Sequence, residues 1–146
     1  MSLRDSAGRA VVAYHATTGF EIRAATFIAG TGPLSPPIDD VDIRIPTKAT
    51  LRRVTILTSG VAGAATNGSC AVDIWKDSYA NWPPTNADDI TGGVSPAISN
   101  GTKYDNSALA GWSTALAAGD VLRVHLASSS VFRRITVQLE LEVEAT

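Results

Sequence analysis

The sequence predicts an all-β protein: an antiparallel β-sandwich of jelly-roll type, with an N-terminal arm or hairpin and one long loop. Apolar and polar residues alternate with a period of two in several runs, which is typical of a strand with one buried face. No long stretch has apolar residues at the three- and four-residue spacing of an amphipathic helix. Glycine, proline and asparagine separate the alternating runs, and many short strands joined by such turns favour a sandwich or a barrel.

The C-terminal run is the clearest strand. Apolar residues from Ile135 to Val143 occupy every second position, and polar or charged residues occupy the positions between them. Because successive side chains of a strand point to opposite faces, one face of this run is buried and the other is solvated. The pattern predicts a half-buried strand over residues 134–144.

Other runs predict the remaining strands. These strands are expected over residues 9–17, 20–28, 40–45, 54–58, 70–76 and 121–126. Thr18–Gly19 forms a hairpin turn between the first two. Pro46 ends the strand at 40–45, since proline cannot donate a hydrogen bond to a sheet, and Cys70 faces inward in the strand at 70–76. The chain then has roughly seven or eight strands in all, within the range of one small β-domain.

The chain has the length of one domain, preceded by an arm. Its 146 residues suit a single core. Residues 29–38, with the sequence AGTGPLSPPI, resemble a linker. We therefore expect residues 1–45 to form an arm or docking segment and residues 46–146 to form the sandwich. The arm would dock on a neighbour by strand addition or swapping.

Residues 77–118 form the predicted long loop, because they show little periodicity and are rich in turn residues. Residues 107–117 within it are expected to form a turn of helix. Loops of this length in compact domains are uncommon and are often functional. Four aromatic residues lie in it: Tyr79, Trp82, Tyr104 and Trp112. We favour a small satellite core that orders the loop; the alternative is a contact surface for a partner, a host or a sugar.

Composition excludes several classes of protein. The formal net charge is -2, from 12 basic and 14 acidic residues, so the chain is not a basic nucleic-acid binder. The single cysteine, Cys70, cannot form an intrachain disulfide, which favours folding in a reducing compartment. No run is long and apolar enough for a membrane helix, and the N-terminus lacks the apolar region of a signal peptide.

No residue pattern indicates an enzyme or a cofactor. His15 and His125 have no partner motif, and Ser128–Ser130 lack the nucleophile-elbow pattern. One cysteine and two histidines exclude the usual structural zinc sites, and Cys70 is expected to be a buried, inert thiol. We therefore expect no catalytic residue and no cofactor.

Two acidic pairs could ligate a hard cation through their oxygens. These are Asp39 with Asp40, and Asp88 with Asp89. Neither pair has the spacing of a calcium loop, so solvated turns are the favoured interpretation. Cation binding at either pair stays open from the sequence.

Two arginine pairs lie at strand positions. Arg52–Arg53 and Arg133–Arg134 place adjacent arginines where a strand would alternate its faces. One member of each pair either points inward or marks a β-bulge. We expect them to pair with aspartates across the sheet or across a subunit boundary.

Three segments carry a resemblance to a known family. They are the run VDIWKDSYANWPPT at residues 72–85, LAGW at 109–112 and AGDVLRV at 118–124. This pattern resembles a β-sandwich module that recurs in structural proteins of tailed bacteriophages, often in tail-fibre and other appendage proteins. The resemblance covers roughly residues 54–142, and residues 1–50 match nothing in it. The family offers no catalytic residues.

The resemblance implies a virion structural protein that is assembled in the host cytoplasm. Three alternatives follow: a capsid cement, decoration or head-fibre protein; a tail or baseplate appendage that contacts the host; and a free carbohydrate-binding module. We expect the first, because 146 residues leave no room for the elongated stalk of a tail fibre. Whether the protein lies on the head or the tail stays open.

The expected partners are other virion proteins, either major capsid or tail proteins, and further copies of this chain. A trimer is expected by analogy with the family, since closed symmetry favours homo-oligomers. A host surface glycan is a candidate ligand. Nucleic acid and membrane insertion are not expected.

Overall fold

The computed structural model describes residues 19–30, 32–35, 40–61, 63 and 65–144, together with the backbone of residues 2–4 and 10–12. All its regular elements are β-strands apart from two short 3-10 helices. In chain order the elements are β1 (Ser2–Arg4), β2 (Ala10–Val12), β3 (Gly19–Ile28), β4 (Val41–Arg44), β5 (Ala49–Gly60), β6 (Gly68–Ser78), η1 (Tyr79–Asn81), η2 (Asn86–Asp88), β7 (Ala97–Gly101), β8 (Lys103–Asn106), β9 (Ala115–Leu116), β10 (Asp120–Ser130) and β11 (Phe132–Val143).

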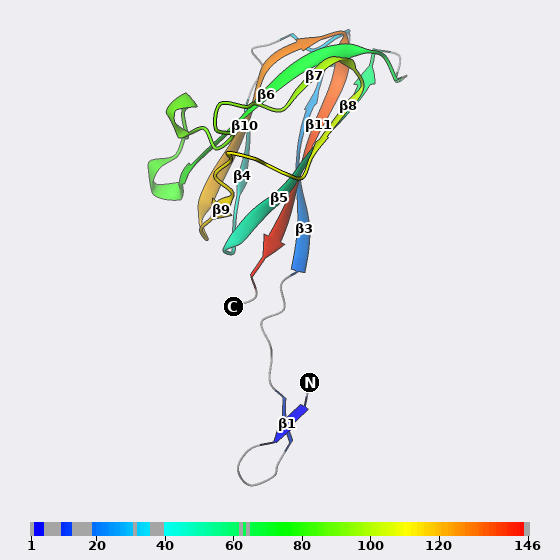
Figure 1. The fold of residues 1–146 in the computed structure, drawn as a ribbon. Coiled ribbons are helices and arrows are strands. Elements are labelled where there is room, and N and C mark those ends of the chain that lie inside the picture. The colour runs from blue at the N-terminus through cyan, green and yellow to red at the C-terminus, as the bar shows by residue number, and fades with distance from the viewer. Residues whose placement is uncertain are drawn as a thin grey trace.

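Two antiparallel sheets pack face to face (Figure 1). The larger sheet has the strand order β3-β11-β5-β8, with the short β9 also paired to β5, and the smaller has the order β4-β10-β6-β7. Within the larger sheet β3 pairs with β11 and β5 with β8, and within the smaller sheet β4 pairs with β10 and β6 with β7. This nested pairing is that of a jelly roll, in which strand pairs roll up into two sheets. The predicted fold class is confirmed.

The core lies between the sheets and is built from the alternating positions. Every second residue of β11 from Ile135 to Leu141 is buried, as the sequence predicts. β6 and β10 bury the same kind of stripe from the opposite sheet. The largest fully buried side chains are Phe132, Ile45, Leu51, Ile56, Ile74, Leu116, Leu122, Leu126, Ile135, Leu139, Leu141 and Val54. The core therefore contains side chains from both sheets.

The sandwich begins before residue 46, which differs from the predicted division. β3 pairs with β11 over all ten of its residues, and β4 pairs with β10. The predicted linker is also partly bonded to the sandwich, because Ala29 and Leu34 donate their N–H groups to the carbonyls of Arg133 and Phe132. β3 and β4 have buried apolar partners in the core, so both strands belong to the sandwich.

The predicted long loop is largely structured. Residues 77–118 contain η1, η2, β7, β8 and β9, and residues 107–117 form turns and a strand in place of the expected helix. Leu109 has a φ of 48°, in the left-handed region, so a helix cannot pass through it. The strands here have two to five residues, which is too short for a period of two to stand out in the sequence.

Both arginine pairs mark β-bulges, as predicted. The register between β11 and β5 shifts at Arg52, and it shifts again at Arg133. The expected contact with an aspartate also exists for one pair, since Arg53 Nη1 lies 3.0 Å from Asp105 Oδ2 on β8. At the other pair, Arg133 donates to the carbonyls of Ala29 and Gly30.

Near the N-terminus the predicted elements are only partly visible. The strand expected over residues 9–17 overlaps β2, which pairs with β1. The rest of that strand, with His15, and residue Thr18 of the predicted turn lie outside the described residues.

Candidate functional site

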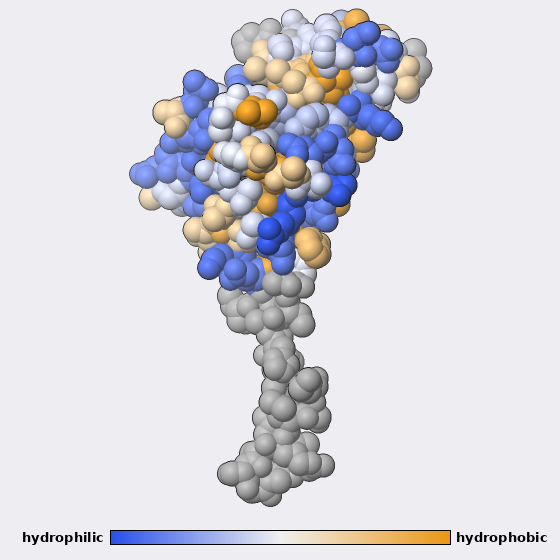
Figure 2. Space-filling model, viewed as in Figure 1, coloured by the Kyte–Doolittle hydropathy of each residue, from blue (hydrophilic) through white to orange (hydrophobic). Residues whose placement is uncertain are grey.

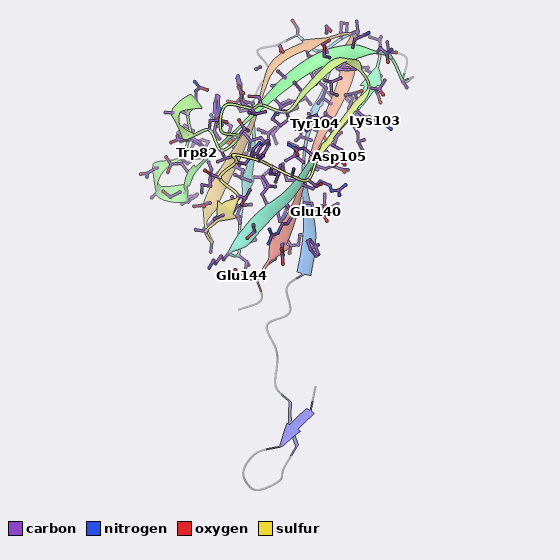
Figure 3. The ribbon with its side chains drawn as sticks, in the orientation of Figure 1. Trp82, Lys103, Tyr104, Asp105, Glu140 and Glu144 are labelled. Atoms are coloured by element: carbon purple, nitrogen blue, oxygen red, sulfur yellow. The ribbon has the colours of Figure 1, made fainter. Side chains whose placement is uncertain are left out.

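The four loop aromatics separate into two groups. Trp112 is only 9% exposed and lies in the core, and Tyr104 is half-buried on β8 opposite Ile56 of β5. Tyr79 and Trp82, by contrast, are 66% and 50% exposed. Figure 3 shows Trp82 in the lobe beside the sandwich, whereas Tyr104 lies on the sheet. The satellite-core interpretation therefore describes Trp112 and Tyr104, whereas Tyr79 and Trp82 are exposed on the surface.

Tyr79 and Trp82 are held at the end of β6 by η1. Ser78 caps this single helical turn, because its side chain accepts a hydrogen bond from the backbone N–H of Asn81. The Trp82 indole Nε1–H donates to Asp42 Oδ2 on β4 at 3.0 Å. The Arg44 guanidinium lies 4.8 Å from the centre of the Tyr79 ring. Both rings are thus fixed against β4.

The two rings share one surface cavity. It has a volume of about 370 Å³ and is lined by Asp42, Arg44, Tyr79, Trp82 and Val121, which we call the aromatic ledge. Val121 lies directly opposite Arg44 across the β4–β10 pair. The ledge is therefore an apolar floor with one guanidinium and one carboxylate at its border.

A charged network supports the ledge from β10. Arg123 donates two hydrogen bonds to Asp42, from Nε at 2.8 Å and from Nη2 at 2.9 Å. Its guanidinium also lies 5.5 Å from the centre of the Trp82 ring and 3.2 Å from Asp40. Asp40 in turn contacts His125 Nδ1 at 2.6 Å. These contacts fix Asp42, and through it the indole of Trp82.

Hydrogen bonds set the charge state of the carboxylate. Those from Arg123 lower the pKa of Asp42 below its ordinary value, burial opposes the shift, and the bond from Trp82 adds to the lowering. The same pairing with Asp42 raises the pKa of Arg123. Asp42 therefore stays ionised and accepts hydrogen bonds across the whole neutral range.

The other polar residues singled out in the sequence have structural contacts. Burial raises the pKa of the Cys70 thiol to about 11, which keeps it protonated. His125 stacks on Trp75, with ring centres 4.7 Å apart. Ser130 accepts a hydrogen bond from the backbone N–H of Ser69 where β10 ends.

The acidic pairs serve turns and ion pairs. Asp88 closes a capping box with Thr85 in η2, and Asp89 accepts hydrogen bonds from Thr91 and Gly93. Asp40 belongs to the network of Arg123, and Asp39 lies outside the described residues. In the part of the chain that the structure describes, no three histidine, cysteine or acidic side chains group as metal ligands.

A second surface lies at the edge of the larger sheet. β3 is the outermost strand there, and no other described strand pairs with its free side. Phe20, Ile22 and Ile28 point away from the core and are 64%, 62% and 64% exposed. We call this strand, with these three side chains, the β3 edge.

The neighbouring strands of the same face carry charges instead. Arg53 on β5 pairs with both Asp105 on β8 and Glu140 on β11, and Arg52 pairs with Glu142. Figure 2 shows hydrophilic residues gathered over β5 and β11, and Figure 3 shows Asp105 and Glu140 on this face. The exposed apolar side chains of this face are thus concentrated on β3, and the neighbouring strand β5 adds Leu57, which is 42% exposed.

Sequence reasoning missed both the partners of the ledge and the β3 edge. Asp42 and Arg123 are 81 positions apart, and nothing local in the sequence pairs them. The β3 edge did have a signal: residues 20–28 carry large apolar residues at both even and odd positions. Such a strand has apolar side chains on two faces, and the core covers only one of them.

Comparison with protein-family models and with curated proteins gives no match to this chain. Among the described residues, no helix is both long and apolar enough to cross a membrane.

Proposed function

We propose that this chain is a bacteriophage virion structural protein, a small capsid cement, decoration or head-fibre protein that assembles on the particle surface. The sequence resemblance over residues 54–142 supports a virion module. The jelly roll is compatible with it, because viral capsid proteins use this fold, although lectins use it as well. The fold therefore allows the proposal without deciding it.

The β3 edge is the observation that carries the proposal. An edge strand presents unpaired N–H and C=O groups, and every second residue directs both of them outward. Monomeric proteins protect long edges with lysine, proline or bulges. β3 has ten residues and contains no lysine and no proline, and its two charged residues, Glu21 and Arg23, pair with each other at 2.9 Å. An unprotected edge with exposed apolar side chains suits a protein that assembles.

The occupant of the β3 edge in this proposal is a neighbouring copy of the same chain. Adding a strand there satisfies the free backbone groups and gives Phe20, Ile22 and Ile28 cross-strand neighbours on the outer face of the sheet. In a closed ring of three copies every β3 edge is paired, and a trimer is the assembly that the resemblance implies. Capsid proteins then contact the outside of the ring.

Labelling of intact particles tests the proposal. Antibodies to this chain, coupled to gold and imaged on purified phage, should label the head at many sites. Label confined to the tail tip would replace the decoration function by that of a host-contacting appendage. Particles that stay unlabelled both intact and after mild disruption would rule out a virion protein.

A further inference from the structure

We propose that the aromatic ledge binds a sugar ring that carries an acidic group, as in an acidic polysaccharide. This inference goes beyond the assembly function. It rests on the outer side of β4 and β10 in the smaller sheet, whereas the assembly function rests on the edge of the larger sheet.

Exposed rings provide the first argument. Tyr79 and Trp82 are both at least half exposed and line one cavity with the apolar side chain of Val121. The C–H faces of a sugar ring pack on such rings, which combine a large apolar face with a polar edge. The cavity of about 370 Å³ falls in the size range of small-ligand sites.

Charge selects the type of sugar. Arg44 borders the cavity beside Tyr79, and it forms no ion pair with any residue of the described chain. Its planar guanidinium is therefore available to a carboxylate or a sulfate, which it can bind through two parallel hydrogen bonds. Both oxygens of Asp42 already accept hydrogen bonds from Arg123. The ledge thus offers a free positive charge and no free negative charge.

The same charges exclude a cationic ligand. Aromatic cages that bind quaternary ammonium groups rely on the negative faces of their rings. Here guanidinium groups already lie 4.8 Å from the centre of the Tyr79 ring and 5.5 Å from that of Trp82. A second cation on these rings would meet two like charges at short range.

Rigidity adds to the expected affinity. The indole of Trp82 is fixed by its hydrogen bond to Asp42, which Arg123 holds in turn. Tyr79 lies on a capped helical turn under Arg44. Because these side chains are ordered before the ligand arrives, binding costs less side-chain entropy than it would at mobile aromatics.

Binding of the purified protein to three polymers tests this inference. The probes are polygalacturonate, which carries carboxylates, chondroitin sulfate, which carries sulfates as well, and neutral dextran. We expect binding to at least one acidic polymer, measured by calorimetry and by a change in tryptophan fluorescence, and no binding to dextran. The preferred acidic polymer then identifies the group that Arg44 holds.

Variants locate the site. Arg44→Ala and Tyr79→Ala should each lower the affinity at least about tenfold, which is the effect of losing one good contact. Val94→Ala is the matched control, because Val94 is an exposed apolar residue that lies outside both the ledge and the β3 edge. It should bind like the wild type. Circular dichroism checks that each variant is folded.

Three results would contradict the inference. Equal binding to dextran and to the acidic polymers overturns the charge argument. No binding to any of the three, or binding that survives in the folded Tyr79→Ala, Trp82→Ala double variant, overturns the site. Only soluble protein is used, so either result leaves the particle-labelling test unaffected.

Discussion

At the scale of single residues, the two tryptophans of the predicted loop have different roles. Trp112 fills the core, while Trp82 lies on the surface with its N–H bonded to Asp42. The sequence could place both in one loop. It could not separate them, because their partners come from strands far away along the chain. Alanine substitution distinguishes the buried tryptophan from the exposed one through the loss of stability.

Trp112→Ala should lower the free energy of unfolding by about 3–5 kcal/mol, because it removes a large buried side chain and leaves a cavity. Trp82→Ala should cost about 1 kcal/mol or less, since half of this side chain is already in water. Urea unfolding of the two variants measures both values. Equal losses would mean that Trp82 belongs to the core as well.

The pairing of Asp42 with Arg123 should appear in the pH dependence of stability. The pKa of Asp42 is lower in the folded protein than its ordinary value of 3.8. The unfolded chain therefore binds this proton more readily, so the pair stabilises the fold above about pH 4. This contribution is lost as the pH falls below that value and through the lowered pKa of the folded state.

Asp42→Asn removes that dependence. At pH 7 the free energy of unfolding should be lower for the variant than for the wild type. This difference should shrink as the pH falls from 4 toward 2. Urea titrations across this range measure it. A difference that is the same at pH 7 and pH 2 would show that the carboxylate charge does not stabilise the fold.

At the scale of elements, the sequence predicted long strands and missed short ones. β11 and β10 have eleven or twelve residues, so their alternation was visible. β8 has four residues and β9 has two, and only the pairing with β5 makes them strands. β3 and β4 were predicted as strands, but they were assigned to an arm, because residues 29–38 between them resemble a linker. Sheet pairing is a long-range property, which local periodicity does not contain.

A glycine at the start of β6 tests how tightly these elements meet. A Cβ atom at Gly68 would lie 2.6 Å from the backbone oxygen of Ser130 and 2.9 Å from Phe132 Cε1. Because backbone cannot move aside cheaply, Gly68→Ala should lower the free energy of unfolding by about 1–3 kcal/mol.

Gly30→Ala is the control for that substitution. A Cβ atom at Gly30 has no neighbour within 4 Å, so thermal and urea unfolding should change little. If both alanine variants were as stable as the wild type, the close approach of β6 to the β10–β11 turn would not exist in solution.

At the scale of the whole molecule, the jelly roll leaves the two proposed interaction surfaces on different sheets. The β3 edge belongs to the larger sheet, and the aromatic ledge belongs to the smaller one. The two proposals together therefore predict that a single copy binds a neighbour and a ligand at the same time. The fold class, the two long central strands and the aromatic residues Tyr79 and Trp82 followed from the sequence. The partners of the ledge and the β3 edge did not, because they depend on which strands become neighbours.

The molecular mass of the assembly in solution tests the central claim most directly. The wild type should be a homo-oligomer, a trimer in our proposal, by light scattering after size-exclusion chromatography. Ile22→Lys places a charge among the exposed apolar residues of the β3 edge and should weaken assembly about a hundredfold or more. Val94→Lys is the matched control, because Val94 is also 62% exposed but lies outside β3, and it should assemble like the wild type. A monomeric wild type, or a folded Ile22→Lys variant with the same mass as the wild-type oligomer, would contradict the account.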